Sequence, residues 1–143
     1  MNTKTFGVAI GFLALTLAGC GLQEGMNEKS NGHIKTTEFP TGAEGKMDRD
    51  AQLPSWVPDE AKSVTEAIRT TGTERILRFT NADLPTTCRP GVVVKTAATL
   101  TADWWPHGTE GKADQVCDQE WHVVKANDAV YAFKPETIDQ SDA

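Results

Sequence analysis

The chain has 143 residues, with 14 Lys or Arg against 20 Asp or Glu, which gives a formal net charge of −6 at pH 7. This length is enough for one small folded domain and no more. The acidic balance argues against a nucleic-acid-binding protein and against an electrostatic grip on anionic lipid.

The N-terminal segment combines one early basic residue, Lys4, with an apolar run from Phe6 to Ala18. A run of this length falls short of the ~20 apolar residues that a membrane-spanning helix needs, and it lies where the apolar region of a secretory signal lies. It ends at Leu17-Ala18-Gly19-Cys20, where small residues are followed directly by a cysteine. We therefore interpret residues 1–19 as a signal peptide.

The four-residue pattern resembles the lipobox of bacterial lipoproteins, and the resemblance covers residues 1–20 alone. It implies that the chain is cut just before Cys20, that Cys20 carries a diacylglyceryl thioether, and that the new amino group is acylated. Two or more acyl chains such as palmitate, at ~0.8 kcal/mol per buried CH₂, anchor a protein stably. The resemblance thus implies a protein on the outer face of the cell membrane, or at the outer membrane of a Gram-negative host.

Two cysteines remain once Cys20 is assigned to lipid, namely Cys88 and Cys117. Export would place them in an oxidising compartment, where a cysteine pair in a small domain is more often a disulfide than a metal site. Their spacing is not Cys-x-x-Cys, which argues against redox exchange and against a thiolate zinc site. We predict a Cys88–Cys117 bridge that contributes on the order of 3 to 4 kcal/mol.

Residues 21–53 are rich in Gly, Asn, Glu, Lys and Thr, with few apolar residues and no sustained period. Such a segment is not expected to bury enough surface to offset its ordering entropy. We predict that lipidated Cys20 and the rest of residues 20–53 form a flexible tether with a reach of roughly 30 Å. A single globular domain is predicted over residues 54–137, followed by a tail at residues 138–143.

Residues 59–70 are open to two interpretations, because their apolar positions fit both one face of a short helix and one face of a strand. The glycine-containing stretch at residues 70–73 and the β-rich run Arg75–Thr80 favour a turn near residues 59–62 followed by a β-hairpin. The stretch from Trp56 through this second strand also resembles exported lipoproteins of actinobacteria, a likeness that carries no function with it.

The next segment is predicted to be a proline-punctuated loop or short helix at residues 82–91 that delivers Cys88. Residues 92–94 and 97–105 are then predicted to be extended. In the second of these runs, apolar and polar residues alternate with the period of a strand that has one buried face.

Residues 120–134 form the clearest predicted hairpin, since Asn127-Asp128 separates two β-rich runs. A two-residue turn there places His122 opposite Phe133. A three-residue loop over Asn127–Ala129 instead gathers four large apolar side chains on one face (Trp121, Val123, Tyr131 and Phe133). Their burial would gain ~1.5 to 3 kcal/mol each, so the three-residue loop is predicted.

These elements together predict an α+β fold: a small antiparallel β-sheet domain with little helix, one disulfide and a flexible N-terminal tether. Catalytic motifs are missing from the sequence, which has no Gly-x-Ser-x-Gly, no Gly-rich phosphate loop and no His-Glu-x-x-His. His107 and His122 could join Asp103 or Asp118 as metal ligands, but two solvated histidines are the simpler interpretation. We expect no metal, no cofactor and no catalytic activity.

The sequence Trp104-Trp105-Pro106-His107 is the strongest candidate for ligand binding. Neighbours on a strand point to opposite faces, so Trp104 would pack with Leu100 and Ala102 and leave Trp105 at the outer face. An exposed Trp beside polar groups can support a sugar ring, a peptide or a protein partner. We therefore predict a ligand site at Trp104, Trp105 and His107.

The alternative for Trp105 is that residues 54–58, or the loop after Gly108, cover its ring. The overall prediction is a non-catalytic binding or interaction module at the cell envelope, whose partner is an envelope protein or glycan and not a nucleic acid. Two other functions remain open, an inhibitor of a secreted hydrolase and a metal-binding protein or enzyme.

Overall fold

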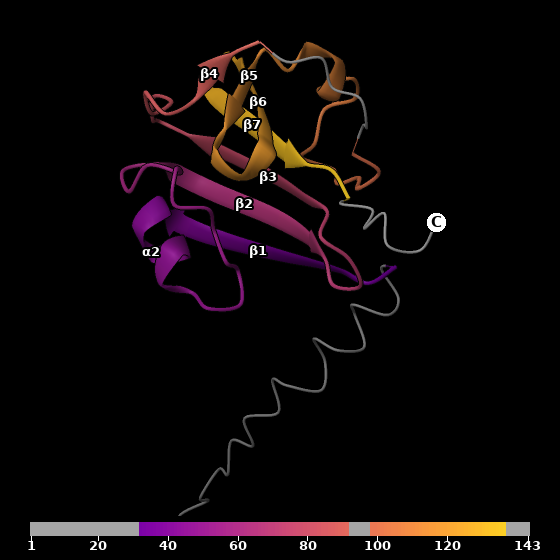
Figure 1. Ribbon diagram of the computed structural model, residues 1–143. Helices are drawn as coiled ribbons and strands as arrows, with labels where there is room; N and C mark the ends of the chain where they lie inside the picture. The colour runs from indigo at the N-terminus through magenta and orange to yellow at the C-terminus, as the bar shows by residue number, and fades with distance from the viewer. Residues whose placement is uncertain (1–31, 92–97, 137–143) are drawn as a thin grey trace, which may run out of the picture.

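The computed structural model describes residues 32–91 and 98–136, which form one antiparallel seven-stranded sheet with a short helix (Figure 1). The strand order is β1-β2-β3-β7-β6-β5-β4, so the predicted fold class is confirmed. No helix within these described ranges is long and apolar enough to cross a membrane. The elements are β1 (Ile34–Thr41), α2 (Gly42–Met47), β2 (Lys62–Arg69), β3 (Arg75–Thr80), β4 (Arg89–Pro90), η1 (Glu110–Lys112), β5 (Gln115–Cys117), η2 (Asp118–Glu120), β6 (Trp121–Ala126) and β7 (Ala129–Lys134).

The predicted tether over residues 20–53 is wrong from Ile34 onward, because β1 and α2 belong to the domain. In Figure 1, β1 is the edge strand beside β2, and the two pair antiparallel from Ile34 opposite Arg69 to Thr41 opposite Lys62. Thr41 then caps α2, its Oγ1 accepting from the backbone N–H of Glu44 at 3.2 Å. An edge strand needs few apolar residues, since its backbone bonds to the neighbouring strand supply much of its order. Residues 20–31 lie outside the described residues.

Glycines of α2 that suggested flexibility are instead required by close packing. A Cβ on Gly45 would lie 2.8 Å from Cδ2 of Leu53 and 2.9 Å from Cδ2 of Phe39. A Cβ on Gly42 would collide with the carbonyl oxygen of Pro58. The helix can therefore approach the sheet and the segment at residues 53–58 only because both positions lack a side chain.

The turn near residues 59–62 and the following hairpin are confirmed. The backbone N–H of Ala61 donates to the carbonyl of Pro58 at 3.2 Å, and β2 then pairs antiparallel with β3. A register shift between Lys62 and Thr65 interrupts the alternation of β2, which explains why the spacing of its apolar residues fitted a helix as well as a strand.

The predicted strand over residues 97–105 is wrong within residues 98–105, which form turns and irregular structure. The N–H groups of Thr99 and Leu100 donate to the carboxylate of Glu74, so this backbone needs no neighbouring strand there. Trp105 N–H bonds to the carbonyl of Ala102 at 2.9 Å, which closes a turn. The extended run expected at residues 92–94, and Ala97, lie outside the described residues.

Both faces of the sheet are covered, which the one-face burial argument did not anticipate. The first core lies under α2 and the segment at residues 53–58, and it consists of Leu53, Trp56, Val57, Ala61, Val64, Leu77, Phe79, Cys117, Trp121, Val123, Val130 and Ala132. The second core is covered by the segment at residues 98–113, and it consists of Ala67, Ile76, Leu100, Trp105 and Phe133.

The predicted three-residue loop of the last hairpin is wrong, because the turn has two residues and pairs Ala126 with Ala129. This register places His122 opposite Phe133, with ring centroids 5.1 Å apart. Aromatic residues need not share one face when each face has its own core. Asn127 has a φ of 55°, a left-handed conformation that Asn tolerates in tight turns.

Glu136 ties the chain after β7 to the turn between β2 and β3. Its carboxylate accepts from the backbone N–H of Thr73 at 2.9 and 3.0 Å and from that of Glu74 at 3.1 Å. Gly72 leaves room for this contact, since a Cβ there would lie 2.7 Å from Oε1 of Glu136.

Replacing Glu136 with alanine is expected to lower the free energy of unfolding by about 1–2 kcal/mol, because two turn N–H groups lose a charged acceptor. Urea unfolding measures the change. Glu38→Ala, at an exposed position of β1, is the control and should change the free energy by less than about 0.5 kcal/mol. Equal losses in the two variants would show that the Glu136 contact does not stabilise the fold.

Candidate functional site

The predicted platform at Trp105 is wrong, because only 7% of this side chain is exposed. Its ring centroid lies 5.9 Å from that of Tyr131 and 6.2 Å from that of Phe133. Its Nε1 donates to Oε1 of Glu110 at 3.1 Å. Glu110 belongs to η1, which follows Gly108. The predicted alternative, in which the loop after Gly108 covers the Trp105 ring, is therefore close to what is observed. The second face of the sheet needs an apolar cover, and Trp105 provides it.

The other two residues of the predicted ligand site, Trp104 and His107, are more exposed than Trp105. Trp104 is half-buried and meets Trp105 edge-on, with centroids 6.1 Å apart. His107 is exposed in the following turn. His122 is half-buried on Phe133, and burial lowers its pKa more than the Glu120 carboxylate raises it. Across residues 32–91 and 98–136, no group of three or more His, Cys, Asp or Glu side chains could hold a metal ion.

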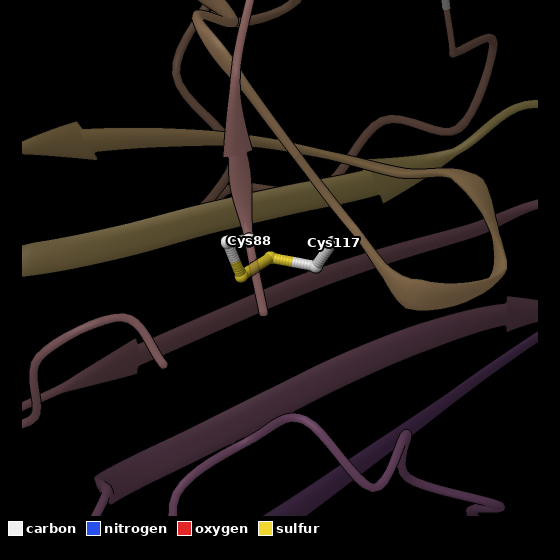
Figure 2. Close-up of a disulfide and its surroundings, with 2 residues drawn as sticks. All are labelled: Cys88 and Cys117. Atoms are coloured by element: carbon white, nitrogen blue, oxygen red, sulfur yellow. A yellow bond between two sulfur atoms is a disulfide. The ribbon is translucent and has the colours of Figure 1, made fainter. Parts of the chain in front are cut away.

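The predicted disulfide between Cys88 and Cys117 is confirmed (Figure 2). It joins the end of the loop after β3 to the end of β5, with Cα atoms 4.1 Å apart. Next to it, Arg89 of β4 pairs with Val116 of β5. Cys117 is buried in the first core, so the bridge connects an exposed loop to the best-packed part of the molecule.

A groove of about 670 Å³ lies beside this bridge, and we call it the disulfide-side groove. One set of lining residues comes from residues 55–60 and another from residues 83–87, with Lys46 and Asp118 also contributing. Four separate parts of the chain thus meet there, and the prediction from the sequence did not include the groove. The prolines on either side of Trp56 were its only sequence signal.

The groove has an apolar lining with an acidic charge. Its accessible apolar surface comes from the half-buried Pro58, Leu84 and Pro85, whereas Trp56 and Val57 line it as buried residues of the first core. Four carboxylates line it, against the single ammonium of Lys46. They belong to Asp59, Glu60, Asp83 and Asp118.

Two of these carboxylates have cationic partners. Asp59 lies 2.8 Å from Nζ of Lys46, and Asp83 lies 2.8 Å from Nζ of Lys125. The hydrogen bond and charge of Lys125 lower the pKa of Asp83. Both pairs are exposed, so each contributes little to stability. The groove keeps a surplus of negative charge even with both pairs formed.

The walls of the groove are held in place before any partner arrives. Residues 86–87 directly precede Cys88, and Asp118 directly follows Cys117, so the bridge ties two of the lining stretches together. The stretch at residues 55–60 is held by Trp56, whose ring lies 5.9 Å from that of Trp121 and 6.1 Å from that of Phe79. Preformed walls reduce the entropy that binding would cost.

Comparison with known proteins identifies no relative, because no protein-family model, no curated protein and no solved structure matches the chain. A function must therefore be inferred from the chemistry of the described residues.

Proposed function

We propose that the protein is an exported, lipid-anchored and non-catalytic interaction module, and that its disulfide-side groove binds a Lys- or Arg-rich segment of another envelope protein. The observation that carries this proposal is the groove itself, in which four carboxylates and one ammonium surround an apolar lining. Opposite charge steers such a partner toward the groove and fixes its register. Apolar contacts with the half-buried Pro58, Leu84 and Pro85 would supply most of the affinity.

The anchor in this proposal is Cys20, at the end of the lipobox-like pattern. The domain begins at Ile34, and residues 21–33 can span at most about 45 Å when fully extended. A lipid on Cys20 would therefore hold the groove within reach of proteins on the same membrane surface. A glycan platform at Trp105 is not part of the proposal, because the ring is buried. No feature of the described residues favours hydrolase inhibition over docking in the groove.

Mass spectrometry of protein extracted from the native membrane tests the anchor. The expected species starts at Cys20 and carries added acyl mass. A Cys20→Ser variant should lose this mass and leave the membrane fraction. A parent protein that is soluble and unacylated would contradict the anchored location.

Peptide titration tests the groove, using the full processed chain with Cys20→Ser to keep it in solution. A peptide of alternating Lys and Pro is the probe, and the same peptide with Glu in place of Lys is the control ligand. We expect saturable binding of the Lys peptide that weakens with salt, and no binding of the Glu peptide. Reversing the charge of Glu60 and Asp118 together should weaken binding by at least about fivefold.

The matched control is Glu38→Lys, which reverses an exposed charge on β1, outside the groove. Comparable weakening by Glu38→Lys would show attraction to net charge in place of docking. Binding that is unchanged in the Glu60 and Asp118 double variant would remove the groove from the proposal.

A further inference from the structure

A second cleft, of about 430 Å³, opens where residues 52–55 lie beside the ends of β3 and β7. We call it the Arg75–Lys134 cleft. Arg75 is the first residue of β3, and Lys134 is the last residue of β7. Its nine lining residues include these two cations and no acid, although acids outnumber bases 20 to 14 in the chain. A locally positive cleft in an acidic protein calls for a physical reason.

The two cations are directly opposed across neighbouring strands. Arg75 and Lys134 are Cα partners in the antiparallel pair of β3 and β7, so their side chains leave the same face of the sheet. Like charges in this position destabilise a sheet. Lys134 forms no ion pair within residues 32–91 and 98–136. The fold therefore carries a repulsion that an anion between the two side chains would relieve.

The nearest carboxylates do not remove this repulsion. Glu66 Oε1 lies 3.6 Å from Nη1 of Arg75, but burial raises the pKa of Glu66 to about 7, against the opposing effect of Arg75. Near neutral pH this group is therefore only partly ionised. Glu136 lies close to Gly72 and Thr73 at the same cleft, where the N–H groups of Thr73 and Glu74 hold its carboxylate. Within the described residues it keeps its charge but forms no ion pair with Arg75 or Lys134.

Gln52 orients Arg75 in the cleft. Arg75 Nη1 donates to the carbonyl of Gln52 at 3.1 Å, and Nη2 donates to its Oε1 at 2.9 Å. Gln52 has a φ of 50°, a left-handed conformation that is unusual for a residue other than Gly or Asn. A guanidinium has five N–H donors, so these two bonds leave others for a ligand.

We infer that the Arg75–Lys134 cleft binds a small organic anion, with its carboxylate or phosphate between the two cations. Both cations form charge-assisted hydrogen bonds with such oxygens, and the arginine fork fits them in pairs. Ser55 lines both this cleft and the disulfide-side groove, but Arg75 and Lys134 lie outside that groove. The inference therefore stands whatever the groove binds.

Titration of the Cys20→Ser chain with four probes tests the inference: inorganic phosphate, acetate, benzoate and neutral benzamide. Tryptophan fluorescence and the thermal midpoint are measured, since Trp121 lines the cleft. A carboxylate ligand predicts that acetate and benzoate bind more tightly than inorganic phosphate, whereas a phosphate ligand predicts the reverse order. Benzamide should not bind. Lack of saturable binding by every anion up to about 50 mM would overturn the inference, because a weaker dissociation constant corresponds to too little binding free energy for a specific site.

Lys134→Gln should weaken anion binding by about fivefold or more, and Lys134→Arg should retain it. The matched control is Lys112→Gln, at an exposed lysine of η1 outside the cleft. Equal weakening in this control would indicate a general ionic effect and would overturn the inference. Charge reversal of Glu60 and Asp118 in the groove should leave anion binding unchanged, so the two sites can fail independently.

Stability without any anion provides a second measurement. At low salt, Lys134→Gln should unfold at a higher urea concentration than the parent, because the variant removes the like-charge repulsion with Arg75. A lower midpoint would show that the Lys134 charge is already paired, and the inference would lose its basis.

Discussion

Removal of the Cys88–Cys117 disulfide is expected to lower the free energy of unfolding by about 3–4 kcal/mol. The bridge spans a sequence separation of 29 residues, so its loss allows the unfolded chain many more conformations. Cys117 is also buried in the first core, where loosening of the loop would expose apolar surface. Small domains have only about 5–15 kcal/mol of stability in total.

Urea unfolding of the parent with and without reductant measures this effect, and a Cys88→Ala and Cys117→Ala double variant repeats it without a reducing agent. The variant treated with reductant is the control and should show no further change. A loss below about 1 kcal/mol would mean that packing alone keeps the loop closed. Binding of the Lys peptide should weaken together with the stability, because the bridge ties two walls of the disulfide-side groove.

Glu66→Gln is expected to stabilise the protein by up to about 3 kcal/mol at pH 8 and to have little effect near pH 4.5. The Glu66 side chain is fully buried, and neither oxygen has a hydrogen-bond partner within the described ranges. Its strand partner in β1 is Thr37, whose Oγ1 is also buried and without such a partner. The charged form is therefore costly, and only Arg75 at 3.6 Å offsets the cost.

The sign of the pH dependence follows from the shift in pKa. Burial raises the pKa of Glu66 from 4.5 to about 7, with Arg75 opposing the shift. Between these two values the folded carboxyl holds a proton that the unfolded chain has lost. The contribution of Glu66 to the free energy of unfolding is therefore most favourable below about pH 4.5, and it falls as the pH rises to about 7. Glutamine cannot ionise and removes this loss.

Urea unfolding from pH 4.5 to 8.5 for the parent, Glu66→Gln and Glu38→Gln tests this prediction. The parent and the exposed Glu38 variant should lose stability together as the pH rises, while Glu66→Gln should not. Glu74 titrates in a different range. Burial alone would raise the pKa of Glu74, but hydrogen bonds from Thr99, Leu100 and Arg69 outweigh this and lower it, so its stabilising effect is lost only below pH 4.5. Parallel profiles for the parent and Glu66→Gln would contradict the prediction.

Prediction from the sequence succeeded where a signal is local. The hairpin of β2 and β3 follows from β-rich runs around a glycine-containing turn, and the last hairpin from Asn127-Asp128 between two such runs. The disulfide follows from the count of cysteines and the expected compartment. The hairpins depend on residues that are close in sequence, and the disulfide depends on two remaining cysteines that allow only one pairing.

Prediction failed where a distant segment sets the environment. β1 contains few apolar residues, and its order depends on pairing with β2, far along the chain. The register of the last hairpin was chosen on the assumption of one buried face, but the segment at residues 98–113 covers the second face. The same segment buries Trp105, which alternation had placed in solvent.

The candidate sites show the same division. Trp56 lies between two prolines in the sequence, but only the folded chain brings the loop at residues 83–87 and Asp118 to the same groove, next to the two bridged cysteines. Arg75 and Lys134 become neighbours only because β3 pairs with β7 and not with the strand that follows it in sequence. Local propensity and spacing are properties of the chain itself. Burial and charge proximity depend on which distant segments meet, and that is a property of the folded state alone.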